Sequence, residues 1–249
     1  MSRKAAKPKA AQPKRKGSEL KPRSWAKWLA VVVLGLLGFP ILQVGCVRVA
    51  EPRITPLMLL RPLEARWSGI AAKPRVYRWI DRAQIPTDFL RCVLAAEDQR
   101  FFEHRGFDWT EMRNARRQAE KSGRAPRGAS TVTMQCARSL FLWQGRSWVR
   151  KGIEAYYTFW METLLSKQRI LELYANVIEM GDGIYGLEAA AQTHFGIPAR
   201  ALAREQCAML TAILPNPRRW NPREPTPKLR GRSAMIRARE RMAKFPQLH

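Results

Sequence analysis

Residues 95–106 have the sequence A-A-E-D-Q-R-F-F-E-H-R-G. The stretch ends an apolar run with a helical period, because Phe89, Val93 and Ala96 recur at i, i+4 and i+7 and share one helix face. Glu97 falls at the edge of this face, where partial loss of water makes a carboxylate a better proton acceptor. Paired aromatic residues and a basic cluster follow at once. The stretch therefore predicts a core helix that ends in a candidate general base.

The composition of the chain sets its class. A length of 249 residues with 46% apolar composition is enough for roughly one soluble domain beside a tail and a membrane segment. The net charge of +25 favours anionic partners such as nucleic acid, anionic lipid or phosphate-bearing substrates. The next segment decides between these partners.

Residues 28–47 are twenty residues without a charge, about enough to cross a bilayer core of roughly 30 Å. A cleaved signal peptide or a buried core helix are the alternatives, but the long basic leader favours an uncleaved anchor. Ten Lys and Arg residues precede the segment and four lie in the twenty residues after it. The positive-inside rule therefore predicts a cytoplasmic N-terminus and a folded domain across the membrane. A nucleic-acid partner is not expected, because the anchor would export the domain.

The chain is predicted to divide into a disordered basic cytoplasmic tail (1–24), a transmembrane helix (25–47), a linker (48–80) and a folded domain (81–249). Within the domain, Thr87 is the expected N-cap of the first helix, and further helices are expected over 130–141, 148–173, 205–214 and from 187 onward. Residues 113–127 are expected to form a mobile basic loop, and the glycines at 181–186 mark a turn. No long alternating pattern is present, so the predicted fold class is mainly α.

The cysteines show no spacing typical of a zinc site. Cys92, Cys136 and Cys207 lie in apolar helical stretches, where a free thiol behaves as a small hydrophobic side chain. Three cysteines cannot all pair, and one disulfide stays open at this stage.

Two further blocks contain candidate site residues. Glu154 has Arg150 at i−4 and Lys151 at i−3, which is also the pattern of an ordinary helix-surface ion pair. Ser130 and Thr131 suit either a helix N-cap or hydrogen bonds to sugar and phosphate oxygens. With three histidines and no triad order, a serine nucleophile is not expected.

Five blocks together resemble a known family. They are E-D-Q-R-F-F-E-H-R-G-F-D, G-A-S-T-V-T-M-Q-C-A-R, R-K-G-I-E, S-K-Q-R-I-L-E-L-Y-A-N and G-D-G-I-Y-G-L-E-A-A-A-Q-T-H-F-G. In order and spacing they resemble the motifs of the peptidoglycan glycosyltransferases, the lipid II polymerases shared with class A penicillin-binding proteins. The resemblance covers roughly residues 90–217 and is closest to the monofunctional form. It implies that residues 81–249 are a lysozyme-like, mainly α glycosyltransferase domain on the periplasmic side of a bacterial inner membrane.

The resemblance also implies roles for individual residues. Glu97 is the general base, and Arg150, Lys151 and Glu154 belong to the pyrophosphate and donor region. Glu154 is the second catalytic carboxylate and helps to organise cations or a divalent metal such as Mg or Mn, although no cofactor is required. The other implied substrate-binding residues are Asp98, Phe101, His104, Ser130, Thr131, Gln135, Arg138 and Asn176. The implied partners are lipid II, the growing glycan chain and the inner membrane, with cell-wall synthesis or division proteins.

The chain departs from the family pattern where Met134 replaces a common Gln, Arg138 a Lys and Ala175 a Leu. Arg138 keeps the charge, whereas Met134 removes a polar group. Two alternatives to an active polymerase therefore remain at this stage. One is a catalytically weakened scaffold for cell-wall assembly, and the other is a lysozyme-like lytic enzyme, which the anchor and the basic site disfavour.

Overall fold

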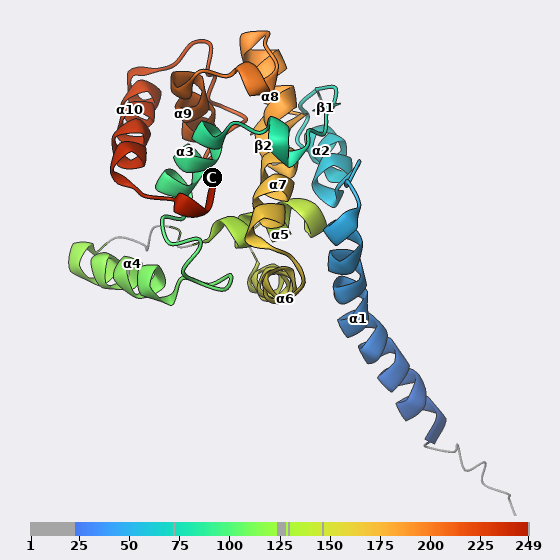
Figure 1. Cartoon of the computed structure of the whole chain (residues 1–249). Coiled ribbons are helices and arrows are strands. Elements are labelled where there is room, and N and C mark those ends of the chain that lie inside the picture. Colours follow the sequence, from blue (N-terminus) through green and yellow to red (C-terminus); the bar gives the residue numbers. More distant parts are fainter. Residues whose placement is uncertain (1–22, 72, 124–127, 129, 146, 249) are drawn as a thin grey trace, which may run out of the picture. The chain divides into compact units, whose positions relative to one another are not determined.

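The computed structural model describes residues 23–71, 73–123, 128, 130–145 and 147–248 (Figure 1). The chain divides into two units, residues 1–39 and residues 40–249. The predicted basic tail lies outside the described residues except for its last two positions. The described part of the chain is mainly helical, which confirms the predicted fold class.

The first helix, α1 (Arg23–Val49), runs through both units and contains Pro40. Its stretch Trp25–Val49 has a mean hydropathy of 2.3 and is long and apolar enough to cross a membrane. From Pro40 onward α1 belongs to the second unit, where Val44 and Val47 are buried. Arg169 holds the end of the helix, because its guanidinium donates to Val47 O at 3.0 Å and to Ala50 O at 2.7 Å. A cation at these carbonyls is favourable at the C-terminal end of a helix.

The rest of the second unit consists of short elements. The helices are α2 (Pro56–Trp67), α3 (Thr87–Glu97), α4 (Trp109–Ser122), α5 (Val132–Phe141), α6 (Trp148–Leu164), α7 (Lys167–Val177), α8 (Leu187–Phe195), α9 (Arg204–Ile213) and α10 (Pro227–Met242). Three 3-10 turns are η1 (Arg82–Gln84), η2 (Ala199–Ala201) and η3 (Pro246–Leu248), and the strands are β1 (Val76–Tyr77), β2 (Glu179–Gly181) and β3 (Ile184–Tyr185).

The strands form one small sheet in the order β1-β3-β2, with β1 parallel and β2 antiparallel to β3. The hairpin between β2 and β3 is the turn that the glycines predicted. Gly186 after it has φ +81°, and a Cβ there would lie 2.4 Å from the Asn176 carbonyl oxygen, so only glycine fits.

Two helical layers position the site. In one, α3 packs against α9 and α10; in the other, α5 packs against α6 and α7 (Figure 1). One apolar core joins the layers and includes Phe89, Leu90, Val132, Met161 and Tyr174. The carboxyl end of α3 and the amino end of α5 therefore meet on a rigid frame.

The prediction of a loop over residues 113–127 is wrong for its described part, which belongs to α4. The helix buries no side chain. Its apolar residues Trp109, Met112, Ala115 and Ala119 share one face, but the basic residues around them favoured the prediction of a loop. Local interactions form it: Asp108 accepts from Thr110 N and Glu111 N at the start, and Gly123 ends it with φ +64°. Residues 124–127 lie outside the described residues.

Two helix boundaries also differ from the predictions. Pro86, not Thr87, is the N-cap of α3, and the single helix expected over residues 148–173 is two. Ser166 starts the second one, because its hydroxyl accepts from Arg169 N at 3.1 Å. The apolar period of residues 148–173 continues across the Ser166 cap, so the period alone predicted one helix. The helix expected over residues 130–141 is present from Val132 onward, and those expected from 187 and over 205–214 are present as α8 and α9. None of the cysteines in the described part is in a disulfide.

Candidate active site

Glu97 lies at the last position of α3 with 17% of its side chain exposed. Its Oε1 accepts from Arg232 Nη2 at 3.0 Å, and its Oε2 accepts from Gln135 Nε2 at 3.1 Å. Arg232 also donates from Nε to Ala212 O at 3.1 Å, which fixes the guanidinium. The carboxylate is thus held in one orientation by two helices, α5 and α10, and keeps part of its surface open.

The orientation of Gln135 depends on a buried tyrosine. Tyr174 donates from its hydroxyl to Gln135 Oε1 at 3.1 Å. Burial, and then the charge of Glu97, raise the pKa of Tyr174 well above its usual value, so the hydroxyl keeps its proton. Since Gln135 Oε1 accepts from the tyrosine, its amide group faces Glu97. Gln135 is therefore a positioning residue for the carboxylate.

Asp98, the residue after α3, links three segments. Its Oδ1 lies 2.8 Å from His104 Nε2, and its Oδ2 accepts from Val132 N at 2.9 Å. The second bond satisfies a free N–H at the amino end of α5, where a negative charge is favourable. Thr131 caps the same helix and donates to Gly106 O at 2.7 Å. These bonds fix the start of α5 beside Glu97.

The block around Glu154 forms a buried ion cluster on α6. Glu154 has no exposed surface; its Oε2 accepts from Arg150 Nη1 at 2.7 Å and its Oε1 from Lys151 Nζ at 2.5 Å. Arg150 is also buried and donates from Nε to Gly145 O at 2.8 Å. The pair predicted at i−4 and i−3 is present, but the expected surface location is not.

Lys151 connects this cluster to the second block. Its side chain is 37% exposed, and its ammonium donates to Ser130 Oγ at 3.0 Å. The cluster of Arg150, Lys151 and Glu154 keeps one net positive charge. Because Arg150 is buried and Lys151 is not, Lys151 is the cation of this cluster that an anionic ligand can reach.

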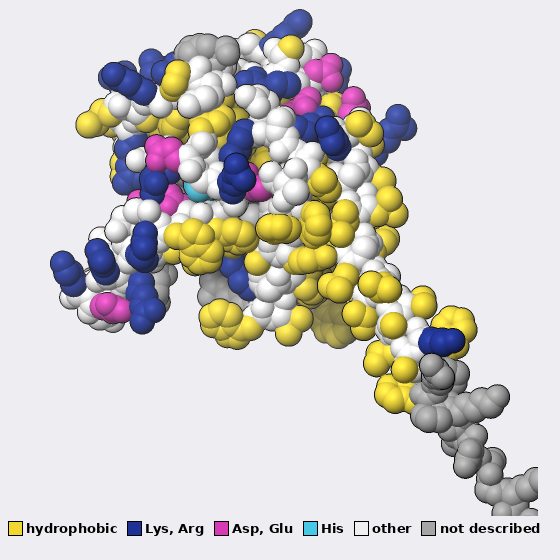
Figure 2. Space-filling model, turned by 60° about the horizontal axis from the view of Figure 1, so that its bottom comes forward, with side chains coloured by type: hydrophobic (Ala, Val, Ile, Leu, Met, Phe, Trp, Pro, Cys, Tyr) yellow, Lys and Arg dark blue, Asp and Glu magenta, His cyan; other side chains and the backbone are white. Residues whose placement is uncertain are grey.

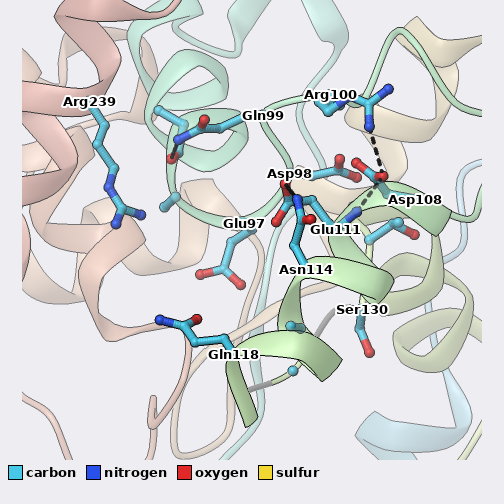
Figure 3. A pocket seen from close by; sticks show the side chains of 15 residues that line it. Glu97, Asp98, Gln99, Arg100, Asp108, Glu111, Asn114, Gln118, Ser130 and Arg239 are labelled. Atoms are coloured by element: carbon cyan, nitrogen blue, oxygen red, sulfur yellow. Dashed lines mark hydrogen bonds and ion pairs between the residues drawn. The ribbon is translucent and has the colours of Figure 1, made fainter. Parts of the chain in front are cut away.

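A cavity of about 470 Å³ opens beside Glu97 (Figure 3). Its lining includes Asp98 and Arg100 from the loop after α3, Ser130 and Thr131 before α5, and polar side chains from α4 and α10. The α4 wall presents Glu111, Asn114 and Gln118, and α10 presents Arg239 (Figure 3). The cavity thus combines a partly exposed carboxylate with amides and hydroxyls that suit a sugar.

Some residues that the sequence singled out lie away from the cavity. Phe101 has no exposed surface and packs in the core with Lys167 Nζ 4.2 Å from its ring centre. Asn176 is fully buried, and its amide bonds both backbone groups of Ile80 at 2.9 Å. Arg138 lies partly buried in the last turn of α5. Phe101 and Asn176 thus support elements of the site, and none of the three residues is among those that line the cavity.

Comparison with known proteins now adds to this geometry. A family model described as Transglycosylase matches residues 66–241, which is more than half of the chain. The chain belongs to the transglycosylase family. Proteins named biosynthetic peptidoglycan transglycosylase are 43% identical in Stutzerimonas stutzeri (86% of this chain, 87% of the relative) and 45% identical in Xylella fastidiosa (85% and 87%). The protein of that name from Xanthomonas campestris pv. campestris is 42% identical over 96% of this chain and 94% of its own length.

The sequence reasoning missed several site residues of this transglycosylase, among them Arg232, Arg239 and Gln118. Arg232 and Arg239 lie on α10, beyond the motif blocks, and Gln118 lies on the helix that was expected to be a loop. Arg232 and Arg239 are seven residues apart, a spacing that places both on one helix face. Nothing in the sequence linked that face to Glu97, which is 135 residues from Arg232.

The carboxylates of the transglycosylase differ in how they suit a divalent cation. Both oxygens of Glu154 already accept from cations, so a metal there would lose two hydrogen bonds and meet two positive charges. Asp98, His104 and Asp108 bring ligand atoms within 4.8 Å of one another. However, Asp98 bonds His104 and α5, and Asp108 Oδ1 holds the start of α4 and Arg100. Asp98, His104 and Asp108 thus join segments of the fold. At Glu154, the surrounding residues do not fit the divalent metal that the resemblance implied.

Proposed function

We propose that this transglycosylase polymerises lipid II into linear glycan strands of peptidoglycan by inverting glycosyl transfer, with Glu97 as the general base. The observation that carries the proposal is Glu97 itself, a partly exposed carboxylate held by Gln135 and Arg232 at the wall of a polar cavity. The family and the names of the relatives support the same activity.

In the proposed reaction, the 4-hydroxyl of the acceptor sugar attacks the anomeric carbon of the growing chain. Glu97 takes the hydroxyl proton as the new glycosidic bond forms, the bond to undecaprenyl diphosphate breaks, and the α-linkage becomes β. Gln135 and Arg232 hold the carboxylate so that it meets the acceptor in one geometry. An inverting displacement needs this one base and stabilisation of the leaving anion.

We assign the leaving diphosphate to the cationic side of the site. Lys151 is partly exposed and hydrogen-bonds Ser130, so its ammonium lies between the second and third blocks. Glu154 and Arg150 are buried beneath it and fix its position. A preorganised cation stabilises the negative charge that develops on a phosphate oxygen without moving during the reaction.

The membrane is the proposed location of the reaction. The described part of the chain has one helix long and apolar enough to span it, and α6 exposes apolar side chains, with Trp148 at 92%. Figure 2 shows such side chains gathered as a band on one face, with Lys and Arg side chains near it. We propose a single-pass inner-membrane protein with a cytoplasmic N-terminus and a periplasmic catalytic unit, in contact with cell-wall synthesis or division proteins.

The test is Glu97→Gln in the full chain, solubilised in detergent and incubated with labelled lipid II. The amide keeps the shape of the side chain but cannot accept the proton, so polymerisation falls by about 10²- to 10⁴-fold. Glu120→Gln on α4 is the matched control, because Glu120 is exposed and pairs only with Arg116 among the described residues.

Polymer that a muramidase digests, formed by the parent and the control at similar rates, supports the proposal. A Glu97→Gln protein that melts with the parent and polymerises at the parental rate would show that Glu97 is not the base. Absence of product from the parent in several detergents and divalent cations would favour a scaffold.

A further inference from the structure

The cavity beside Glu97 contains one cation whose role the proposed reaction does not explain. Among the lining residues that the structure describes, the cations are Arg100 and Arg239. Arg100 already has ion-pair partners, Glu103 at 2.8 Å and Asp108 at 3.2 Å. Arg239 is exposed and has no ion-pair partner in the described part of the chain. Its guanidinium is therefore free to bind a ligand.

The position of Arg239 places it opposite the acidic end of the cavity. Figure 3 shows its side chain extending from α10 into the space that Glu97 and Gln118 also face. The neighbouring acids Asp98 and Asp108 are bound to His104 and Arg100. Anionic groups entering the cavity thus find an available guanidinium on the α10 side. On the other side lie the bound carboxylates of Asp98 and Asp108, and the exposed carboxylate of Glu111, which accepts from Asn114 Nδ2 at 3.4 Å.

Helix α10 is held rigidly enough to make this placement specific. Glu240, next to Arg239, is buried and lies between Arg91 of α3, at 3.2 Å, and Arg204 of α9, whose Nε donates at 3.0 Å. About two turns before Glu240, Arg232 bonds Glu97 and Ala212 O. A guanidinium fixed on such a helix loses less freedom when it binds a planar oxyanion.

We infer that Arg239 is a specificity-determining residue that binds an anionic group of the acceptor, phosphate or carboxylate, while Glu97 takes the proton from the acceptor hydroxyl. The inference rests on the proposed function. The acceptor carries such groups in two places, the diphosphate that links it to the lipid and the carboxylates of its peptide. A fork of N–H donors suits either group.

The test measures a single transfer with the full chain in detergent micelles. The donor is lipid II with its 4-hydroxyl capped, so it cannot act as acceptor. Three acceptors are compared: lipid II, lipid II with its peptide carboxylates amidated, and an analogue with a neutral link in place of the diphosphate. Transfer to lipid II by the parent establishes the proposed function before any variant is considered.

Arg239→Gln is expected to lower kcat/KM for lipid II by about 10- to 100-fold, mostly through KM, as for the loss of a hydrogen bond to a charged group. With the acceptor that lacks the recognised anion, Arg239→Gln and the parent should have the same kcat/KM, and this identifies the anion. Arg239→Lys should recover part of the loss. Arg241→Gln is the control, since it removes the same charge from an exposed position of the same helix.

Two results would overturn the inference. One is an Arg239→Gln protein that uses lipid II as well as the parent. The other is an equal loss with all three acceptors, which would mean that Arg239 acts on Glu97 or on the fold. Matching melting temperatures of the variants separate these causes.

Discussion

Replacing Glu154 by Gln should test whether the third block is a buried cluster or an ordinary surface pair. The carboxylate has no exposed surface, and Arg150 beside it has a side chain only 9% exposed. The substitution leaves that guanidinium buried without a counter-charge, and removing one member of a buried pair costs about 3–5 kcal/mol. The amide oxygen can still accept one hydrogen bond, so we expect the lower end, about 3 kcal/mol. For a domain of this size, that corresponds to a melting temperature lower by roughly 6–12 °C.

The matched control has the same i,i+4 spacing in a different environment. Arg116 and Glu120 pair at 3.0 Å on α4 with 80% and 62% of their side chains exposed. Glu120→Gln should therefore cost only a few tenths of a kcal/mol. Thermal unfolding of the parent and both variants, in the same detergent, gives the comparison. A Glu154→Gln protein that melts within about 2 °C of the parent, as the control should, would refute the burial argument.

A double variant separates stability from activity at this cluster. Arg150→Met combined with Glu154→Leu replaces the buried charges by apolar side chains, and such replacements are often neutral or stabilising. We expect its melting temperature to recover toward that of the parent. Polymerisation should nevertheless be lost in this double variant, because Lys151 lacks the carboxylate that orients it.

Backbone conformation, burial and charge distribution each give a further prediction. Gly186→Ala should destabilise the fold by about 2 kcal/mol or more, because Gly186 has φ +81° and no space for a Cβ. In Gly152→Ala, on α6, the added Cβ meets nothing within 4 Å, so this variant should not be destabilised. Urea unfolding of the two variants gives the comparison. Burial raises the pKa of Cys92 to about 12, so at pH 8 only about one thiol in ten thousand is ionised. Iodoacetamide should therefore modify Cys92 only after unfolding, and rapid labelling of the native protein would contradict this. A reporter active only outside the cytoplasm, fused after His249, should be active, with the N-terminal tail retained; an inactive reporter would place the catalytic unit on the wrong side.

The sequence predicted those parts of the fold that have an apolar period or a turn residue. Helix α3, the glycine turn and helices α8 and α9 have such signals and are present. Helix α4 was missed because its few apolar residues stand among many charged ones. Its stability comes from the Asp108 cap, from Gly123 and from pairs on its own surface. The boundary at Ser166 was missed because the apolar period continues past it, although the backbone hydrogen bonds of α6 end there.

The candidate site was predicted to a similar extent. The predicted residues Glu97, Ser130 and Thr131 line the cavity. Two more predicted residues contact them, because Gln135 donates to Glu97 and Lys151 donates to Ser130. Burial could not be predicted, because a periodic pattern shows which residues share a face and not how closely another helix covers it. Glu154 therefore looked like a surface acid.

The C-terminal helix shows why the motif blocks alone do not make a complete site. Without α10, Glu97 would lose the guanidinium on Oε1 and the cavity would lose the wall that carries Arg239. Glu240 is the last residue on which this depends, because its ion pairs with Arg91 and Arg204 join α10 to α3 and α9. The family model ends at residue 241, directly after that contact. Since the last motif block ends at Gly196 and the resemblance near Pro217, the smallest active unit must extend past them to the ion pairs that hold the general base in place.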